Sequence, residues 1–286
     1  MTDPHHPVPA VAVTGATGRL GGRVAHRLSA AGVAQRLLVR DSSRAPRLPA
    51  ATAAVAPFAD RAAVRAALTG VDRVLMVSAS ETPDRVEQHR AFVDAAAEAG
   101  VTHLVYISFF GASPDATFTL ARDHHATEEH IRASGLAHTF LRDNLYADFT
   151  PHLAGEDGVI RGPAGEGRAA VVAQDDIADA ATAVLLAAPD HAGATYDLTG
   201  PEALTLDEVA GVITEVTGRA TTYQRETREE AYRSRAAYGA PDWQLDAWVS
   251  TYTAIANGEL SGVTDHVERL TGHPATSLAE VLRRAG

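Results

Sequence analysis

A glycine-rich loop near the start of the chain constrains the fold more than any other feature. The apolar run Val8-Pro-Ala-Val-Ala-Val13 leads into Thr14-Gly-Ala-Thr-Gly-Arg-Leu-Gly-Gly22, and a helical pattern continues from Arg19 to about Ala31. The glycines stand at positions 15, 18 and 21. In a strand–loop–helix unit, this spacing allows in turn a tight turn, a close backbone approach to a pyrophosphate, and close packing of helix on strand. The sequence therefore predicts a dinucleotide site on Gly15, Gly18 and Gly21, with the amides at the helix start facing the anion.

Apolar runs and helical patterns alternate along the first two hundred residues. Strands are predicted at Ala10–Thr14, Arg36–Arg40, Ala53–Pro57, Arg73–Ser78, His103–Ser108, Ala137–Arg142 and Thr195–Leu198. Helices are predicted at Arg19–Ala31, Arg61–Leu68, Asp84–Ala99, Leu120–Ser134 and Asp175–Ala187. This alternation predicts an α/β fold of the Rossmann type, with a doubly wound parallel sheet.

The pattern loosens after Asn144 and changes again near residue 200. The segment Gly155–Gly167 is rich in glycine and acidic residues, which predicts a loop insertion near residues 150–167. From Pro201 onward the pattern is mostly helical. We therefore expect an NAD(P)-binding Rossmann domain over residues 8–200 and a smaller, mostly helical lobe over residues 201–286. Such a lobe would cover the carboxyl ends of the strands, where α/β folds bind ligands.

Composition excludes several classes of function. A net charge of −11 argues against a nucleic-acid surface, which usually needs a basic face. No apolar stretch approaches the roughly 20 residues of a membrane span, so we expect a cytoplasmic protein. The absence of cysteine excludes thiol catalysis and Cys-ligated metal. His124, His125 and His130 lack the spacing of a metal pair on a helix, so no metal site is predicted.

Arg40 bears on the choice of cofactor. It ends the second predicted strand, where an NAD enzyme would have an acidic residue for the ribose diol, and an arginine there favours the 2′-phosphate of NADP. Arg19 offers a second phosphate contact. Asp41 follows at once and keeps NAD as the less favoured alternative, and Arg40 can also be a solvated residue at a strand end.

Other residues complete the predicted cofactor site, each with a plainer alternative. Asp60 can approach the adenine or cap the helix that follows it. Ser78 and Ala79 can lie beside the nicotinamide ribose or form an ordinary loop. The predicted cofactor residues are Gly15, Thr17, Gly18, Arg19, Leu20, Gly21, Arg40, Asp60, Ser78, Ala79 and Ser108.

A set of ordered motifs over nearly the whole chain resembles the atypical short-chain dehydrogenases/reductases. The similarity is greatest to the NmrA-like branch, which includes type 2 quinone oxidoreductases and triphenylmethane reductases. The motifs are Val13-Thr-Gly-Ala-Thr-Gly-Arg-Leu-Gly-Gly22, Leu38-Val-Arg40, Ala99-Gly-Val-Thr-His-Leu-Val-Tyr-Ile-Ser108, Leu120-Ala-Arg-Asp-His124-His-Ala-Thr127-Glu128, Thr139-Phe-Leu-Arg142-Asp-Asn144-Leu-Tyr146 and Gly272-His-Pro-Ala-Thr-Ser-Leu-Ala279.

The resemblance implies a bilobed fold with the nicotinamide between the lobes, and hydride transfer to a quinone or a similar conjugated acceptor. The chain contains no lysine, so the Tyr–Lys pair of the standard enzymes cannot exist here. His124 and Glu128 occupy the Tyr and Lys places. His124 is the catalytic candidate, as a proton donor, with a structural histidine as the alternative. Residues expected on the acceptor side are Phe109, Phe110, Asn144, Tyr146 and Trp243, with a core position as the alternative for Trp243.

Two classes of function follow from these features. The first is an NADPH-dependent reductase whose partner is a small conjugated molecule. The second is a non-catalytic NADP(H)-binding sensor of the NmrA-like type, because a missing Tyr–Lys pair suits both. The sequence leaves a homodimer open.

Overall fold

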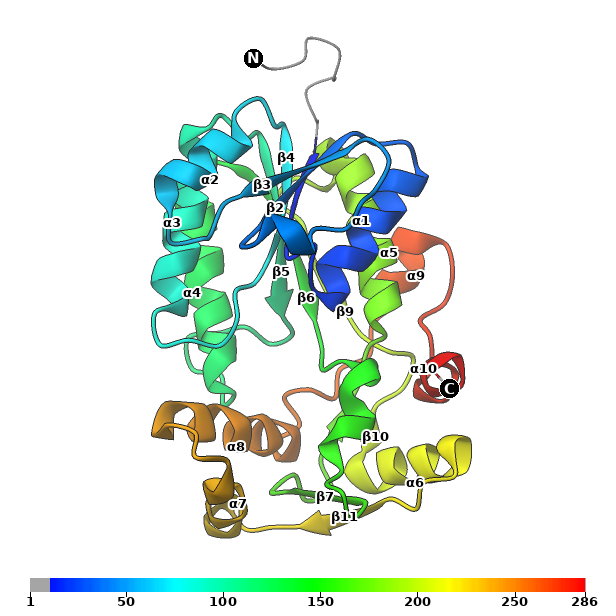
Figure 1. The fold of residues 1–286 in the computed structure, drawn as a ribbon. Coiled ribbons are helices and arrows are strands. Elements are labelled where there is room, and N and C mark those ends of the chain that lie inside the picture. Colours follow the sequence, from blue (N-terminus) through cyan, green and yellow to red (C-terminus); the bar gives the residue numbers. More distant parts are fainter. Residues whose placement is uncertain (1–10, 286) are drawn as a thin grey trace. The chain divides into compact units, whose positions relative to one another are not determined.

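The computed structural model describes residues 11–285, which divide into two compact units (Figure 1). Unit 1 holds the described residues up to Ser108, together with Ala126–Leu141 and Ile177–Tyr196. Unit 2 holds Phe109–His125, Arg142–Asp176 and the described residues from Asp197 onward. Each unit has a hydrophobic core of its own. The units thus interleave along the sequence, and the expected domains, 8–200 and 201–286, stay a prediction whose residues 8–10 lie outside the described part.

The central sheet has seven strands in the order β3-β2-β1-β4-β5-β6-β9. The pairs β1–β2, β2–β3, β1–β4 and β4–β5 are parallel. The strand order reverses between β1 and β4, as in a doubly wound fold, so the predicted Rossmann-type fold is confirmed. The strands are β1 (Val11–Thr14), β2 (Gln35–Val39), β3 (Ala51–Val55), β4 (Arg73–Val77), β5 (His103–Phe109), β6 (Ala137–Asp143) and β9 (Thr195–Leu198).

The helices of the βα repeats pack their apolar faces on the sheet. In α1 the buried face includes Leu20, Val24 and Leu28, which recur at the spacing of one helical face. Figure 1 shows α2 and α3 on one side of the sheet and α1 on the other. Short 3-10 turns lie at Ser42–Arg44 and Ala188–His191. The helices are α1 (Arg19–Ala30), α2 (Arg61–Leu68), α3 (Arg85–Glu98), α4 (Thr119–Ala133) and α5 (Gln174–Leu186), of which α4 from Ala126 and α5 from Ile177 belong to unit 1.

Unit 2 combines two short strand pairs with helices. β7 (Val159–Gly162) pairs in parallel with β11 (Thr222–Arg225), and β8 (Arg168–Ala169) pairs antiparallel with β10 (Leu204–Thr205). The expectation that Gly155–Gly167 is only a loop was therefore wrong at β7, because its partner strand lies far along the sequence. The other elements are the 3-10 segments Ala147–Leu153 and Ala236–Tyr238, and α6 (Leu206–Thr217), α7 (Arg228–Arg235), α8 (Asp242–Ala256), α9 (His266–Thr271) and α10 (Leu278–Ala285).

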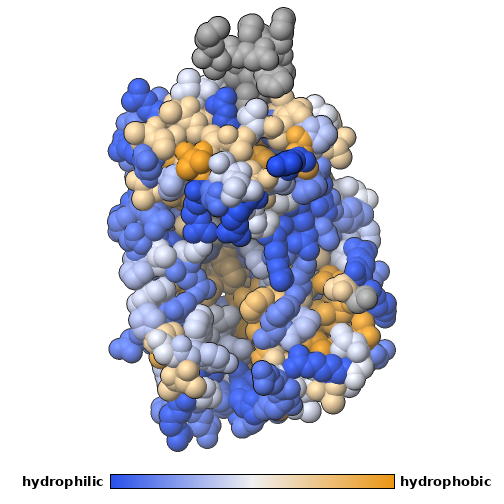
Figure 2. Space-filling model, viewed as in Figure 1, coloured by the Kyte–Doolittle hydropathy of each residue, from blue (hydrophilic) through white to orange (hydrophobic). Residues whose placement is uncertain are grey.

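The surface drawn in Figure 2 is mostly hydrophilic, with smaller hydrophobic areas between the polar ones. The exposed large hydrophobic residues are far apart in sequence: Val55, Phe149, Leu186, Tyr238 and Val263. Among residues 11–285, no helix has both the length and the apolar character needed to cross a membrane.

Candidate functional site

The glycine-rich loop joins β1 to α1 in unit 1. Gly15 has a positive φ of 65°, and the Gly18 amide donates a 2.8 Å hydrogen bond to the Gly15 carbonyl oxygen, which closes the turn. A Cβ atom on Gly21 would lie 2.5 Å from that same oxygen. No side chain larger than hydrogen fits there without a backbone shift, so Gly21 allows the close helix–strand packing that its position predicts.

The start of α1 fits an anionic ligand. Gly18 is the N-cap, with no side-chain cap hydrogen bond, and the first turn carries no acidic residue. The leading amides of a helix have no intrahelical acceptor, and their dipoles favour negative charge. Thr17, Gly18 and Arg19 are exposed around these amides, while Leu20 points into the core. The loop therefore has the backbone donors and the open space that a dinucleotide pyrophosphate requires.

Arg40 is the exposed charged residue that directly follows β2. In the part of the chain that the structure describes, its side chain makes no hydrogen bond or ion pair. Asp41 is engaged locally: its Oδ1 accepts from the Ser43 hydroxyl at 2.7 Å and from the Ser43 amide at 2.9 Å. These two bonds hold the pKa of Asp41 below its usual value. Arg40 is thus available to a phosphate, whereas the Asp41 carboxylate is bound to Ser43 within the local turn.

Asp60 follows β3 and caps α2. Its Oδ1 accepts a 3.0 Å hydrogen bond from the Ala63 amide. This is helix capping, the alternative to adenine binding predicted from the sequence. The residue is exposed. Its contact with the adenine stays a prediction.

The ends of β1 and β4 lie side by side at the switch in strand order. The Val77 amide donates a 2.8 Å hydrogen bond to Thr14 Oγ1, and a Cβ atom on Gly15 would lie 3.2 Å from Val77 Cβ. The glycine loop and the segment Ser78-Ala79 are therefore neighbours. Ligands of open α/β sheets bind in such a crevice, outside the strand ends.

Two residues of α3 that sequence reasoning missed hold the segment after β4. The Ala79 amide donates to His89 Nε2 at 2.9 Å, and Arg85 Nε donates to the Ala79 carbonyl oxygen at 3.0 Å. Arg85 is 4% exposed and His89 is fully buried. A signal was present in the sequence, because Arg85 and His89 are four residues apart and continue the buried face of Phe92 and Ala96.

Ser108 lies at the end of β5 and is the last residue of the first segment of unit 1. Its hydroxyl donates a 2.6 Å hydrogen bond to Oε1 of Glu128, and Arg132 Nη2 lies 3.1 Å from Oε2 of the same carboxylate. Glu128 is fully buried. The carboxylate is thus compensated by a charge and a hydroxyl, as a buried carboxylate requires.

The catalytic candidate and the predicted acceptor residues belong to unit 2. His124 is 7% exposed, and its ring lies 6.1 Å from that of Phe109, which contacts Phe118 edge-on at 4.9 Å. The Tyr146 hydroxyl donates to Asp143 Oδ2 at 2.9 Å. His124, Phe109 and Tyr146 are thus partly or fully packed, and their contact with an acceptor stays a prediction.

The other predicted acceptor residues have structural contacts. Asn144 is buried; its Nδ2 donates to the Leu260 carbonyl at 3.0 Å and its Oδ1 accepts from the Leu145 amide at 2.8 Å. Phe110 packs against Gly262, where an added Cβ would lie 2.8 Å from the ring. Trp243 is half-buried near the start of α8. Any acceptor role of Asn144 has to coexist with its two backbone hydrogen bonds.

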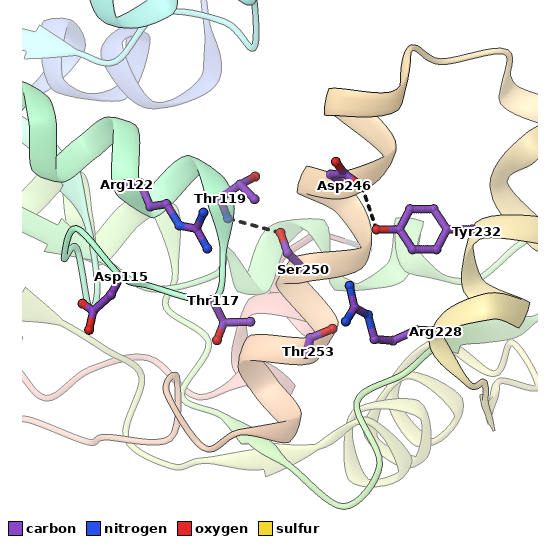
Figure 3. A pocket seen from close by; sticks show the side chains of 9 residues that line it. All are labelled: Asp115, Thr117, Thr119, Arg122, Arg228, Tyr232, Asp246, Ser250 and Thr253. Atoms are coloured by element: carbon purple, nitrogen blue, oxygen red, sulfur yellow. Dashed lines mark hydrogen bonds between the residues drawn. The ribbon is translucent and has the colours of Figure 1, made fainter.

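Unit 2 also contains a polar pocket of about 360 Å³ (Figure 3). Figure 3 shows the guanidinium groups of Arg122 and Arg228 reaching toward α8 from α4 and α7. The Tyr232 hydroxyl donates to Asp246 at 2.7 Å, and the Thr119 amide donates to Ser250 Oγ at 3.2 Å. The lining residues are Asp115, Thr117, Thr119, Arg122, Arg228, Tyr232, Asp246, Ser250 and Thr253.

None of the predicted acceptor residues lines this pocket, and the sequence offers no signal for it. Its polar residues come from α4 and the segment before it, and from α7 and α8, which lie about a hundred positions further along the chain. All nine side chains are polar or charged, so the pocket suits a hydrogen-bonding or charged group better than an aromatic ring.

Comparison with known proteins gives the class to which this site belongs. The NAD(P)H-binding family matches residues 15–188, more than half of the chain. The protein therefore belongs to the NAD(P)H-binding family. The matched segment contains all the predicted cofactor residues, from Gly15 to Ser108.

Particular relatives extend over almost the full length. Quinone oxidoreductase 2 of Escherichia coli (strain K12) is 34% identical over 277 residues, which cover 94% of this chain and 96% of that protein. The NAD(P)H azoreductase of Xenophilus azovorans is 32% identical over 275 residues, with the same two coverages of 94% and 96%. The resemblance to oxidoreductases that was inferred from the sequence motifs is thus confirmed.

Solved structures agree with these relatives. The NADPH complex of the E. coli NADPH-dependent quinone oxidoreductase has a TM-score of 0.87 and 33% identity, covering 96% of this chain and 99% of that one. The NADP(H) complex of the Citrobacter triphenylmethane reductase has a TM-score of 0.85 and 32% identity, covering 97% and 100%. The negative transcriptional regulator NmrA, at 16% identity and a TM-score of 0.75, shares the fold.

Proposed function

We propose that the protein is an NADPH-dependent reductase that transfers hydride to a quinone or a similar conjugated acceptor. The observation that carries the proposal is the glycine loop at the strand-order switch, which leads into a helix start without a side-chain cap hydrogen bond. The chain is also similar over 94% of its length to a quinone oxidoreductase. When bound, the reduced nicotinamide supplies the hydride.

Unit 1 supplies the nucleotide site in this proposal. The amides of the loop from Gly15 to Gly21 bind the pyrophosphate, and Arg40, with Arg19, binds the 2′-phosphate. Asp60 lies on the adenine side, and Ser78, Ala79 and Ser108 lie on the nicotinamide side. NADP is preferred over NAD because the exposed charge at the end of β2 is positive, while Asp41 is bound to Ser43.

Unit 2 supplies the acceptor residues in this proposal. A quinone is already electrophilic, so its reduction needs mainly proximity and alignment with the cofactor. The reduced oxygen then takes a proton, and His124 is the residue that donates it. Phe109, Phe110, Asn144, Tyr146 and Trp243 shape the acceptor side. The Glu128 carboxylate is bound by the Ser108 hydroxyl and by Arg132.

The alternative is a non-catalytic NADP(H)-binding sensor. The regulator NmrA, at 16% identity, supports the shared fold alone, whereas reductases match at more than 30% identity over almost the whole chain. We therefore place the reductase first. We further propose that the protein is cytoplasmic and that its partner is a small molecule, not a nucleic acid or a membrane. A homodimer remains open.

The test is NADPH oxidation by the purified protein against benzoquinones, naphthoquinones and one cationic dye, without added metal or flavin. Turnover that follows the loss of NADPH absorbance is the expected result. Tight NADPH binding without turnover on any acceptor would contradict the reductase function and favour the sensor function.

A further inference from the structure

The peptide groups on either side of Ala79 are held by two side chains of a single helix. The amide of Ala79 donates to His89 Nε2 at 2.9 Å, and its carbonyl oxygen accepts from Arg85 Nε at 3.0 Å. The two residues stand four positions apart on α3, so they lie on one face of the helix. Ala79 itself is the second residue after β4. Because both of its polar backbone groups are bound, the conformation of this segment is fixed from α3.

The histidine of this arrangement is itself held in one tautomer. Nε2 accepts the Ala79 proton, so in the neutral ring the hydrogen is on Nδ1, which donates to Thr127 Oγ1 at 2.8 Å. Both His89 and Thr127 are fully buried. Burial lowers the pKa of His89 to about 3, and the nearby charge of Arg85 contributes a smaller part of this shift. The ring is therefore neutral at physiological pH and accepts from the Ala79 amide.

The held segment lies beside the glycine loop. Val77, two residues before Ala79, contacts Gly15 through the close approach described above and binds Thr14 through its amide. The ends of β1 and β4 form the switch point of the sheet. The segment after β4 therefore lies beside the glycine loop, at the switch point where a dinucleotide of this fold would pass from its pyrophosphate to its second nucleoside.

We propose that His89 and Arg85 are positioning residues that hold the Ala79 backbone in the conformation to which the nicotinamide half of NADP(H) binds. The inference rests on the proposed function, because it concerns the same cofactor. Neither side chain needs to touch the cofactor. Their effect is to make the backbone rigid before binding, so that binding does not have to order it.

A second buried histidine of unit 1 gives a matched control. His103 is 4% exposed, and its Nε2 lies 2.8 Å from Thr139 Oγ1, so it forms a His–Thr pair like that of His89 and Thr127. Neither His103 nor Thr139 touches the segment after β4 in any hydrogen bond that the structure shows for them. Loss of either histidine should lower the melting temperature, but only the loss of His89 should alter the cofactor site.

The experiment compares His89→Ala with His103→Ala by fluorescence or calorimetric titration of two ligands. NADPH contains both nucleosides, whereas adenosine 2′,5′-bisphosphate contains only the adenosine half. In His89→Ala the Kd of NADPH should rise about tenfold, the order of one or two lost hydrogen bonds, while that of the bisphosphate changes less than about twofold. In His103→Ala both values should stay at those of the parent protein. Arg85→Met should act like His89→Ala.

The outcomes separate the two proposals. Equal increases of Kd for both ligands in His89→Ala, or no increase for NADPH, would overturn the positioning role. Failure of the parent protein to bind either ligand would overturn the proposed function itself. Should His89→Ala not fold, Thr127→Val removes the acceptor of Nδ1–H at nearly constant side-chain volume, and an NADPH Kd raised about threefold with an unchanged bisphosphate Kd is then required.

Discussion

The hydroxyl of Ser108 donates a 2.6 Å hydrogen bond to Glu128, a fully buried carboxylate that also pairs with Arg132. The sequence resemblance places Glu128 where the standard short-chain dehydrogenases have their lysine. A lysine ammonium lowers the pKa of a neighbouring tyrosine, whereas a carboxylate would raise it. Glu128 therefore cannot take over that task, and its contacts are those of a structural ion pair at the end of β5.

Replacing Arg40 by Ala should weaken NADPH binding by about 1.5–3 kcal/mol, the range for a hydrogen bond to a charged group, and leave NADH binding nearly unchanged. The reason is the 2′-phosphate, which NADH lacks. Titration of both nucleotides by fluorescence measures the effect. Arg90→Ala, which removes the same charge from an exposed position on α3, is the control and should change neither affinity. Equal affinities of the parent protein for NADPH and NADH would contradict the NADP assignment.

Replacing Gly18 by Val should abolish nucleotide binding in a folded protein. A Cβ atom at Gly18 would meet only the Gly15 oxygen, at 3.2 Å, so the fold can accept it with a small shift, but the branches would fill the space above the helix start. Circular dichroism and NADPH titration test the two halves of this expectation. Gly211→Val serves as the control, because nothing lies within 4 Å of the added Cβ atom there. Unchanged NADPH affinity in folded Gly18→Val would place the nucleotide elsewhere.

The stability of the protein should fall as the pH drops below about 6.5. Burial, aided by Arg85, lowers the pKa of His89 from 6.5 to about 3, so in that interval the unfolded chain takes up a proton that the folded protein does not. The contribution of His89 to the free energy of unfolding is then fully present above about pH 6.5, and it decreases by about 1.4 kcal/mol per pH unit below that value. The Tyr106 ring also contacts the His89 ring edge-on.

Urea unfolding at pH 7 and pH 5 measures this dependence. From pH 7 to pH 5, His89 should account for about 2 kcal/mol of lost stability, and His89→Gln should show a correspondingly smaller loss. Burial also lowers the pKa of His103, so part of the dependence should persist in that variant. An identical pH dependence in parent and variant would mean that His89 is not a buried neutral histidine.

Replacing His124 by Ala should slow quinone reduction without abolishing it. General acid–base assistance contributes about 10²–10⁴-fold, while the alignment of cofactor and acceptor would survive the substitution. Steady-state kinetics at saturating NADPH gives kcat, and nucleotide titration shows whether the cofactor site is intact. An unchanged kcat would assign His124 a packing role against Phe109.

The polar pocket of unit 2 should favour acceptors that carry an anionic group. Arg122 and Arg228 reach into it, and both lining carboxylates already accept a hydrogen bond, Asp246 from Tyr232 and Asp115 from Ser113. A sulfonated naphthoquinone and its uncharged parent compound form a matched pair of probes. Arg122→Gln and Arg228→Gln should each raise the KM of the sulfonated compound about tenfold. The KM of the uncharged compound should stay constant, and so should both values in Arg233→Gln, an exposed position of α7 outside the pocket. Parallel changes for both quinones would contradict an anion preference.

Much of the fold could be predicted because its signals are local. The helix Arg61–Leu68 and the strand Thr195–Leu198 have the predicted bounds, since capping residues, glycines and apolar periodicity mark them. β7 was missed because its pairing with Thr222–Arg225 depends on residues about sixty positions away. The pocket was missed for the same reason.

The candidate site was predictable where backbone geometry alone defines it. Gly15 and Gly21 have the positive φ and the close packing that their spacing requires. His89 and Arg85 continue a buried helix face, which was a signal in the sequence. They were missed because the sequence does not show their partner, the backbone of Ala79. Asn144 shows the converse: it was predicted to bind the acceptor, which stays a prediction, while both ends of its amide bind the backbone.

The boundary between Ser108 and Phe109 has a consequence for changing the protein by design. All the predicted nucleotide residues precede it, whereas His124 and every predicted acceptor residue follow it, in a unit with a separate hydrophobic core. A mutant library confined to unit 2 would therefore leave the packing beneath the glycine loop untouched. We expect selection for new acceptors from such a library to leave the cofactor unchanged, and substitutions at Arg40 to alter the coenzyme preference separately.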